Sequence, residues 1–575
     1  MIEVPAILFG SAFTVASSWA AGRLLLRNTR LRRGELELAA FVTGGACLSL
    51  LVFVVAVAEL VYPATFLLLG ATLLFLLVGQ DGILRRLGKP LRRRRVNNPP
   101  PVDNLPYIWP FAALLLLYSA LYLSQALGPE YSPDGSTYHL GYVARYLRQH
   151  GFSGITTSFY ANMPQGLEML FLFAFAFGKH SSAAMVHFAF LISLALGMVT
   201  YARRFGFPLA GMFAAVLVYL SPVFGYDGTV AYNDVAAACV TFFLFYLLQI
   251  WAEERQDALL IPIGVLAGFA YAIKYTGGLA AIYAIVFVLW KRGRVLAVAP
   301  GVAVMAIPWM AKSWILAGNP FTPFFNRWFP NPYVSAAFED EYRRMYLPST
   351  GVWAHFLDAT LRVGPAAAIV GPVFLLAPLA LLAARSQQGR QLLLAGLLFL
   401  MPGAFQVQTR FLLPAIPFIA LAMGVVLQRI PATIYVLALV HAVLCWPTVM
   451  LHYADDSLRV RHFLPKQALR IEPEDSTLTY RLPGYKLAKL IEQQTPPNAR
   501  VFCYASPAEA YTSRELLIYY ESTQNREDLD LLSQGNFTEL KRRGLTHVLV
   551  LNTFPGDLSS LRKLGVAENA TLYEL

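Results

Sequence analysis

Long apolar runs recur along this chain, and they exclude a soluble globular fold. Two of them, FVTGGACLSLLVFVVAVAEL at 41–60 and WPFAALLLLYSALYLSQAL at 109–127, approach or meet the roughly 20 residues that an α-helix needs to cross hydrocarbon. Charged residues make up only 14% of the chain and apolar residues 57%, whereas soluble proteins carry about a quarter charged residues. We therefore predict an α-helical polytopic membrane protein.

The short loops are basic, which sets the predicted orientation because cytoplasmic loops are enriched in Lys and Arg. The basic segments are 27–33, 81–95, 203–204, 291–294, 385–390 and Arg429. Placing all of them in the cytoplasm predicts about 12–14 transmembrane helices, with both termini outside. The candidate spans lie near 5–26, 37–60, 64–80, 108–127, 183–201, 209–225, 235–251, 259–274, 277–291, 295–316, 364–383, 391–405, 411–428 and 432–449.

Much of the net charge of +12 comes from the basic run within 81–95. Its place beside a span predicts contact with anionic lipid headgroups. Nucleic acid is therefore not an expected partner.

One apolar segment, PQGLEMLFLFAFAFG at 164–178, is shorter than a span, and counting it as one would invert every later loop. We predict that it lies in the interface or dips into the membrane, within a large external loop 128–182. The external side then also receives 226–234, the turn after Lys274, 317–362, 406–410 and everything after 450. Any chemistry is expected on that side.

From about Pro465 the composition changes to that of a soluble domain. The pattern predicts helices at 486–494 and 528–544 and buried strands at 499–505 and 546–552, which indicates a small α/β domain. We divide the chain into N-terminal transmembrane helices with a basic cytoplasmic loop (1–106), a transmembrane catalytic module (107–464) and this C-terminal domain (465–575), whose expected role is to cap or shape a site.

The cysteines and histidines do not form a metal-binding pattern. Cys47, Cys239, Cys445 and Cys503 are far apart and contain no CxxC pair, so neither disulfides nor a zinc site is expected. His139, His180 and His187 invite a metal interpretation, but His180 and His187, seven residues apart, have no carboxylate at ligand spacing. We expect no metal and no cofactor.

Asp134 lies in the first large external loop, in SPDGSTYHLGYVARYL, directly before a helical pattern. It has two readings of about equal weight: a turn and N-cap residue, or a general base at the edge of the bilayer. The neighbouring Tyr138 and His139, together with Tyr131, Tyr142 and Arg145, offer aromatic faces and hydrogen-bond donors that suit a polyol. Glu130 is a weaker candidate for the same role.

Two further acids lie in the next external loop. Asp227 and Asp234 flank GTVAYN, and Asp234 begins the span 235–251. An aspartate near a helix N-terminus is favoured by the helix dipole whatever its function, and we give this structural interpretation the greater weight. Carboxylates converging on one cavity would supply a base and a group that orients a substrate hydroxyl.

Lys274 and Arg410 each lie at the outer end of a span, in GFAYAIKYTGGLA and QTRFLLPAIP. Snorkelling to the headgroups is one explanation. We favour phosphate binding, because an ionisable residue within an apolar span indicates function and Arg can engage a phosphate through two parallel hydrogen bonds.

The order of these motifs resembles that of the integral-membrane GT-C glycosyltransferases, the superfamily of the protein O-mannosyltransferases and the lipid A aminoarabinose transferases. The series runs through SPDGSTYHLGYVARYL, NMPQGLEMLF, ARRFGFPLAGMFAAVLVYLSP, AYNDVAAACVTFFLFYLL, GFAYAIKYTGGLA, AGNPFTPFF and QTRFLLPAIP. It covers roughly 107–575, including a soluble domain after the last span.

The resemblance implies transfer of a sugar from a polyprenyl-phosphate donor to a glycan, lipid or protein acceptor on the outer face. By analogy Asp134 is the catalytic base, Asp234 the second acid, and Lys274 and Arg410 hold the phosphate of the donor. Direct displacement would invert the anomeric centre. Protein O-mannosyltransferases carry adjacent Asp and Glu in the first loop, whereas Gly135 follows Asp134 here, which argues against a mannosyl-to-protein activity.

The resemblance also suggests a bacterial inner membrane with the active site and C-terminal domain facing the periplasm. A secondary transporter and a non-catalytic lipid-binding scaffold stay open as alternatives. A transporter would need polar or broken helices at mid-membrane and inverted repeats. A scaffold would be indifferent to replacement of Asp134.

Overall fold

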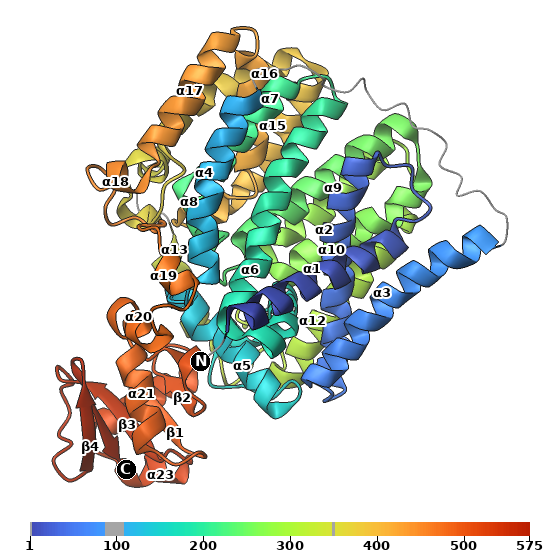
Figure 1. Ribbon diagram of the computed structural model, residues 1–575. Coiled ribbons are helices and arrows are strands. Elements are labelled where there is room, and N and C mark those ends of the chain that lie inside the picture. Colours follow the sequence, from blue (N-terminus) through green and yellow to red (C-terminus); the bar gives the residue numbers. More distant parts are fainter. Residues whose placement is uncertain (1–2, 87–107, 348–350) are drawn as a thin grey trace.

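A computed structural model describes residues 3–86, 108–347 and 351–575. The chain forms a large bundle of helices, from one end of which a small domain with a β-sheet projects (Figure 1). Part of the predicted basic cytoplasmic loop, residues 87–95, lies outside the described residues.

Every one of the predicted spans overlaps a helix in the structure. These helices are α1 (Val4–Leu25), α2 (Arg33–Val57), α3 (Pro63–Arg86), α4 (Ile108–Leu127), α6 (Gly166–Arg204), α7 (Pro208–Tyr219), α9 (Asp234–Glu254), α10 (Leu260–Ile273), α11 (Gly278–Trp290), α12 (Ala299–Ala317), η8 (Pro372–Arg385), α15 (Gln387–Leu400), α16 (Ile416–Leu427) and α17 (Pro431–Leu444).

By length and composition, six helices among the described residues could cross a membrane, and seven shorter apolar helices accompany them. The predicted α-helical polytopic class is thereby confirmed.

Shorter helices occupy the loops between these elements. They include η1 (Gly135–His139), α5 (Leu140–Gln149), η2 (Phe159–Asn162), α8 (Pro222–Asp227), η4 (Tyr275–Gly277), α13 (Ala336–Tyr346), α14 (Val352–Leu357), η10 (Thr409–Leu412) and α18 (Pro447–Met450). Helix α5 is amphipathic and buries Leu140, Tyr142, Val143 and Tyr146.

The short apolar segment 164–178 becomes the first part of α6. The helix bends at Lys179, whose φ of 56° and ψ of −145° are non-helical, so the segment and the following span have different directions. Residues Gly166–Phe175 are buried inside the protein. The bend separates this first part of α6 from the long span that follows it.

Small residues allow α1 and α2 to pack closely. A Cβ at Gly22 would lie 1.8 Å from the carbonyl oxygen of Ala40, and one at Gly44 would lie 1.6 Å from that of Ser18. Neither position could hold a side chain without moving a backbone. Close approach through Gly, Ala and Ser is the usual way in which membrane helices gain packing contacts.

Helix α9 runs through the centre of the bundle, with every residue from Asp234 to Trp251 buried. Its 21 residues span about 30 Å, roughly the thickness of the hydrocarbon layer. Ionisable side chains gather at both of its ends and leave the middle apolar.

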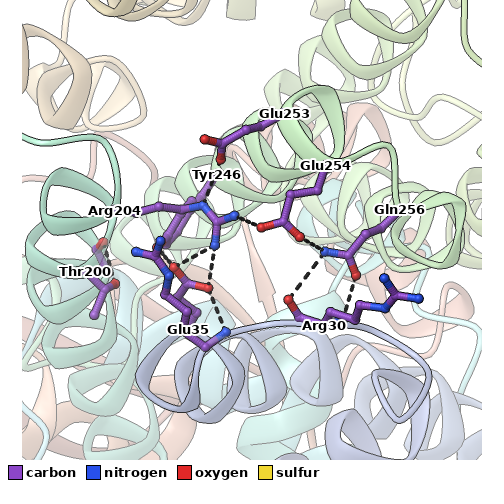
Figure 2. A network of polar contacts seen from close by, with 10 residues as sticks. Arg30, Glu35, Thr200, Arg204, Tyr246, Glu253, Glu254 and Gln256 are labelled. Atoms are coloured by element: carbon purple, nitrogen blue, oxygen red, sulfur yellow. Dashed lines mark hydrogen bonds and ion pairs between the residues drawn. The ribbon is translucent and has the colours of Figure 1, made fainter. Parts of the chain in front are cut away.

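At the C-terminal end of α9, Arg204 from α6 joins α2 and α9 through a polar network (Figure 2). Its Nη1 donates to Glu35 Oε2 at 2.9 Å and its Nε to Glu253 at 3.2 Å, and it also contacts Glu254. Tyr246 donates to Glu35 Oε1 at 2.9 Å. The guanidinium side chain is only 2% exposed.

The C-terminal domain carries a five-stranded sheet of order β2-β1-β3-β5-β4. Strand β1 pairs in parallel with β2 and β3, and β5 pairs antiparallel with β3 and β4. The strands are β1 (Arg500–Tyr504), β2 (Glu515–Ile518), β3 (His547–Leu551), β4 (Arg562–Ala567) and β5 (Ala570–Glu574), with helices α19 (Pro465–Ala468), α20 (Glu474–Arg481), α21 (Tyr485–Gln494), α22 (Thr523–Ser533) and α23 (Phe537–Arg542) and the turn η11 (Glu509–Tyr511).

The strands predicted at 499–505 and 546–552 and the helix at 486–494 are confirmed as β1, β3 and α21. The single helix predicted at 528–544 is wrong. It is two helices, because Gly535 takes a φ of +68° and Asn536 caps the second helix. Strands β2, β4 and β5 were not predicted from the sequence pattern.

Candidate functional site

A cavity of about 220 Å³ lies where the loop that begins at residue 128 meets the ends of α6, α9 and α10. It contains six of the seven predicted site residues; Asp227 is the exception. The lining residues are Asp134, Tyr138, His139, Tyr160, Met163, Pro164, Gln165, Glu168, Asn233, Asp234, Ile273, Lys274, Tyr275, Thr276, Phe324, Tyr342, Tyr346, Gln406, Gln408, Arg410 and Phe411.

Asp134 faces a cation and not its own helix. It precedes η1, yet its carboxylate makes no capping hydrogen bond. Its Oδ2 accepts from Arg410 Nη1 at 2.5 Å and from the Tyr138 hydroxyl at 3.0 Å. The side chain is 25% exposed, so a ligand can reach it. The geometry favours the site reading of Asp134 over the N-cap reading.

The surroundings of Asp134 keep it ionised. Burial raises the pKa of the carboxyl, but the charge of Arg410 and the hydrogen bonds from Arg410 and Tyr138 outweigh burial and lower the pKa below its ordinary value. At neutral pH the group is therefore a carboxylate that can accept a proton.

Asp234 and Lys274 form the second pair of opposite charges. Asp234 is the first residue of α9, and its Oδ1 accepts from Lys274 Nζ. Lys274 follows the last residue of α10 in an extended conformation (φ −158°, ψ 140°), which turns its side chain away from the helix. The carboxylate is 4% exposed and the lysine 21%.

The ring of Phe411 brings the two pairs together. Lys274 Nζ lies 3.8 Å from the ring centroid, and the guanidinium carbon of Arg410 lies 5.7 Å from it. Cations within about 6 Å of an aromatic face are attracted to it. Phe411 therefore holds both cations beside one cavity.

Aromatic rings form one wall. Tyr138 and Tyr160 stack with their centroids 4.2 Å apart and their planes at 3°, and Phe324, Tyr342 and Tyr346 extend the aromatic lining. Flat aromatic faces and hydroxyl groups suit the alternating apolar and polar surfaces of a sugar.

Glu168 is a cavity residue that the sequence analysis did not single out. It is 3% exposed, and its Oε1 accepts from His139 Nδ1 at 2.6 Å and from Asn233 Nδ2 at 3.2 Å. A signal was present, since Glu168 is the one acid within the apolar run 164–178 and an ionisable residue in such a run indicates function.

Asp227 lies outside the cavity and caps α9. Its Oδ1 accepts from the backbone N–H of Val235 at 2.8 Å, and the residue is 2% exposed. It borders a separate void of about 10 Å³ that Arg410 also lines. Asp227 therefore only stabilises the start of α9, as the structural interpretation of these acids predicts. Asp234 instead contacts a cation.

The other polar residues of the first loop are used in the scaffold. Glu130 accepts from the backbone N–H groups of Ser132 and Ala231, both at 2.7 Å, and so joins the loop after α4 to the loop before α9. Tyr142 donates to Ser158 at 2.5 Å, and Tyr131 to Gln125 at 2.8 Å. Arg145 lies 3.6 Å from Glu515 of the C-terminal domain.

His180 and His187 each contact a different backbone carbonyl. His180 Nε2 contacts the carbonyl of Ala510 at 3.1 Å, and His187 Nδ1 that of Val230 at 2.9 Å. In the part of the chain that the structure describes, no group of three or more His, Cys, Asp or Glu side chains could hold a metal ion.

Known proteins match this chain in one sequence segment and in the overall fold. Residues 165–314 match the family model of dolichyl-phosphate-mannose-protein mannosyltransferase, a segment that includes Glu168, Asp234 and Lys274. No curated protein sequence matches the chain.

The fold is similar to that of ArnT from Cupriavidus metallidurans in the apo state, with a TM-score of 0.51 and 15% identity over 81% of this chain and 97% of that chain. The structure of ArnT from the same organism bound to undecaprenyl phosphate gives a TM-score of 0.49 and 14% identity over 81% of this chain and 98% of that one. The segment match and the fold confirm the resemblance to GT-C membrane glycosyltransferases.

Proposed function

We propose that this protein is a glycosyltransferase that moves a sugar from a polyprenyl-phosphate donor to a hydroxyl group of an acceptor. The observation that carries the proposal is the meeting of two pairs, Asp134 with Arg410 and Asp234 with Lys274, in one cavity with an aromatic wall. The fold and the segment match support the same reaction class.

In the proposed reaction the acceptor hydroxyl oxygen attacks the anomeric carbon of the donor sugar. The bond between that carbon and the phosphate oxygen breaks, and the polyprenyl phosphate leaves with the electron pair. Asp134 takes the proton of the attacking hydroxyl. Lys274 and Arg410 stabilise the charge that develops on the phosphate, because they are fixed in place before the reaction. A single displacement inverts the anomeric centre.

Donor binding would also activate the base. The positive charge of Arg410 contributes to the low pKa of Asp134. A phosphate bound to Arg410 offsets that charge, so the pKa of Asp134 rises and the carboxylate becomes a stronger base. The base thus gains strength only when a donor is present.

The orientation follows from the charge of the loops. With the basic loops in the cytoplasm, the cavity and the C-terminal domain face the other side, which in a bacterial inner membrane is the periplasm. The acceptor, whether a glycan, a lipid or a protein, would be met there.

The test is transfer by purified protein of a radiolabelled sugar from a panel of polyprenyl-phosphate sugars. We expect Asp134→Asn to lower turnover by about 100- to 10,000-fold, as loss of a general base does, while donor binding is kept. Lys274→Ala should weaken donor binding.

Asp227→Asn is the matched control, since its amide oxygen can still accept from Val235 and it lies outside the cavity. Full activity of Asp134→Asn would exclude the base. Substrate flux without any transfer would support a transporter instead.

A further inference from the structure

Glu168 is a buried carboxylate that the proposed reaction leaves without a role. It lies in the first turn of α6, is 3% exposed and lines the cavity. Its neighbours along α6, Leu167 and Met169–Phe175, are apolar and buried, so a charged residue at this position needs a specific reason.

The two oxygens of Glu168 differ. Oε1 accepts from His139 and Asn233, both of which point N–H groups at it. Oε2 is buried and has no hydrogen-bond partner among the described residues. Buried polar atoms almost always have a partner, and an unpaired one costs free energy. Because Glu168 lines the cavity, a ligand bound there is one source of the donor group that Oε2 lacks.

The position of Glu168 indicates which part of the donor it would meet. His139 belongs to the same turn as Tyr138, which contacts Asp134, and Asn233 directly precedes Asp234. Glu168 thus lies between the loops that carry the two carboxylates. A carboxylate repels a phosphate and accepts hydrogen bonds from hydroxyl or ammonium groups. The phosphate belongs with Lys274 and Arg410, so the sugar is the part that faces Glu168.

We propose that Glu168 recognises the transferred sugar, with Oε2 accepting a hydrogen bond from a hydroxyl or ammonium group of that sugar. This inference rests on the proposed function. It assigns sugar specificity to a residue other than Asp134, Lys274 and Arg410, which act in the proposed reaction. His139 and Asn233 hold the carboxylate in place through Oε1.

The substitution Glu168→Gln distinguishes the roles of the two carboxylate oxygens. A glutamine carbonyl can still accept from His139 and Asn233, while its NH₂ group replaces Oε2 and can only donate. The matched control is Asp227→Asn, the same change from carboxylate to amide at a residue outside the cavity.

The experiment compares the affinity of each protein for a polyprenyl-phosphate sugar and for the same polyprenyl phosphate without sugar. For Glu168→Gln we expect the sugar-bearing lipid to bind about 10- to 100-fold more weakly, the effect of one hydrogen bond to a charged group. Binding of the sugar-free lipid should not change, which also shows that the variant is folded. Asp227→Asn should leave the ratio of the two affinities as in the wild type.

An equal loss for both lipids would mean that Glu168 only supports the fold, and no loss for either would also overturn the proposal. Donor sugars that each lack one hydroxyl group test the proposed hydrogen bond from the side of the ligand. One of them should bind the wild type as weakly as the full donor binds Glu168→Gln, and should lose nothing further in that variant. If the wild type bound neither lipid, the proposed function itself would fail, a result distinct from all of these.

Discussion

At the scale of single residues, the partners of each carboxylate separate candidate chemistry from support of the fold. Asp134 and Asp234 each contact a cation in the cavity, whereas Asp227 contacts a backbone N–H and Glu130 contacts two. All four are acids in or beside two loops, and Asp134 and Asp234 stand at the start of helices η1 and α9. What each side chain contacts therefore says more than its residue type does.

Tyr138→Phe tests the proposed base without touching the carboxylate. The hydroxyl of Tyr138 donates to Asp134 and helps to lower its pKa. Without that bond the pKa of Asp134 rises, and because the base must be ionised, the acidic limb of the rate profile should move to higher pH. Turnover near that limb should fall by about tenfold.

The control for Tyr138→Phe is Tyr160→Phe, which keeps the stacked rings and leaves the hydrogen bond to Asp134 in place. The measurement is the pH dependence of the rate at saturating donor. Identical profiles for the two variants would contradict a hydrogen bond that tunes the base.

At the scale of elements, α9 connects two polar regions through an apolar interior. Its N-terminus carries Asp234 in the cavity, and its C-terminus carries Glu253 and Glu254 beside Arg204 (Figure 2). The network around Arg204 ties α6 and α9 to α2 at the end remote from the site. It fixes the bundle and takes no part in the proposed reaction.

Arg204→Leu should therefore destabilise the protein and leave donor affinity unchanged. The substitution leaves the buried carboxylate of Glu35, only 4% exposed, without its cation, and breaking such a buried pair costs about 3–5 kcal/mol. The exposed neighbour offers the control Arg203→Leu. Thermal unfolding in detergent and donor binding below the transition would check both parts, and a variant with wild-type melting temperature would contradict the structural role.

At the scale of the whole molecule, the C-terminal domain holds segments that form the cavity wall. The Asn525 side chain donates to the carbonyl of Thr157 at 2.9 Å. The backbone N–H of Phe159 donates to the backbone carbonyl of Glu521 at 3.0 Å. These bonds fix the segment that carries Tyr160. The N–H of Thr523 likewise donates to the carbonyl of Tyr333 at 2.8 Å, just before α13 with its Tyr342 and Tyr346. The domain at the lower left of Figure 1 is thus coupled to the cavity.

Two glutamates at this interface make its stability depend on pH. Burial raises the pKa of Glu509 to about 7, and burial together with the charge of Glu509 raises that of Glu521 to about 8. Glu509 packs against α5, where a Cβ at Gly141 would lie 3.0 Å from its Cγ. In the undocked state both groups would ionise near their ordinary value of 4.5.

Because these two pKa values are raised on docking, docking is strongest below pH 4.5 and weakens as the pH rises through 7 and 8. We expect amide-hydrogen protection in residues 140–149, corrected for the intrinsic exchange rate, to fall as the pH rises from 4.5 to about 8 and to change little above that. In the double variant Glu509→Gln and Glu521→Gln the protection should not depend on pH. The same fall in the double variant would assign the effect to other groups.

Much of the fold could be predicted from the sequence because burial in a membrane acts on each segment separately. An apolar run of sufficient length forms a helix whatever its neighbours are, so α1, α2, α4 and α9 were predictable, as were the buried strands β1 and β3. The broken helix at Gly535 and the edge strands β2 and β4 depend on their surroundings and were not.

The sequence by itself also determined which residues could carry chemistry, since Asp134, Asp234, Lys274 and Arg410 are ionisable groups at the ends of apolar segments. Only the tertiary structure decided how they pair. Asp134 and Arg410 are 276 residues apart, and Glu168 meets His139 and Asn233 only when α6, η1 and α9 converge. Such contacts depend on the packing of several helices at once, which no local pattern of residues encodes.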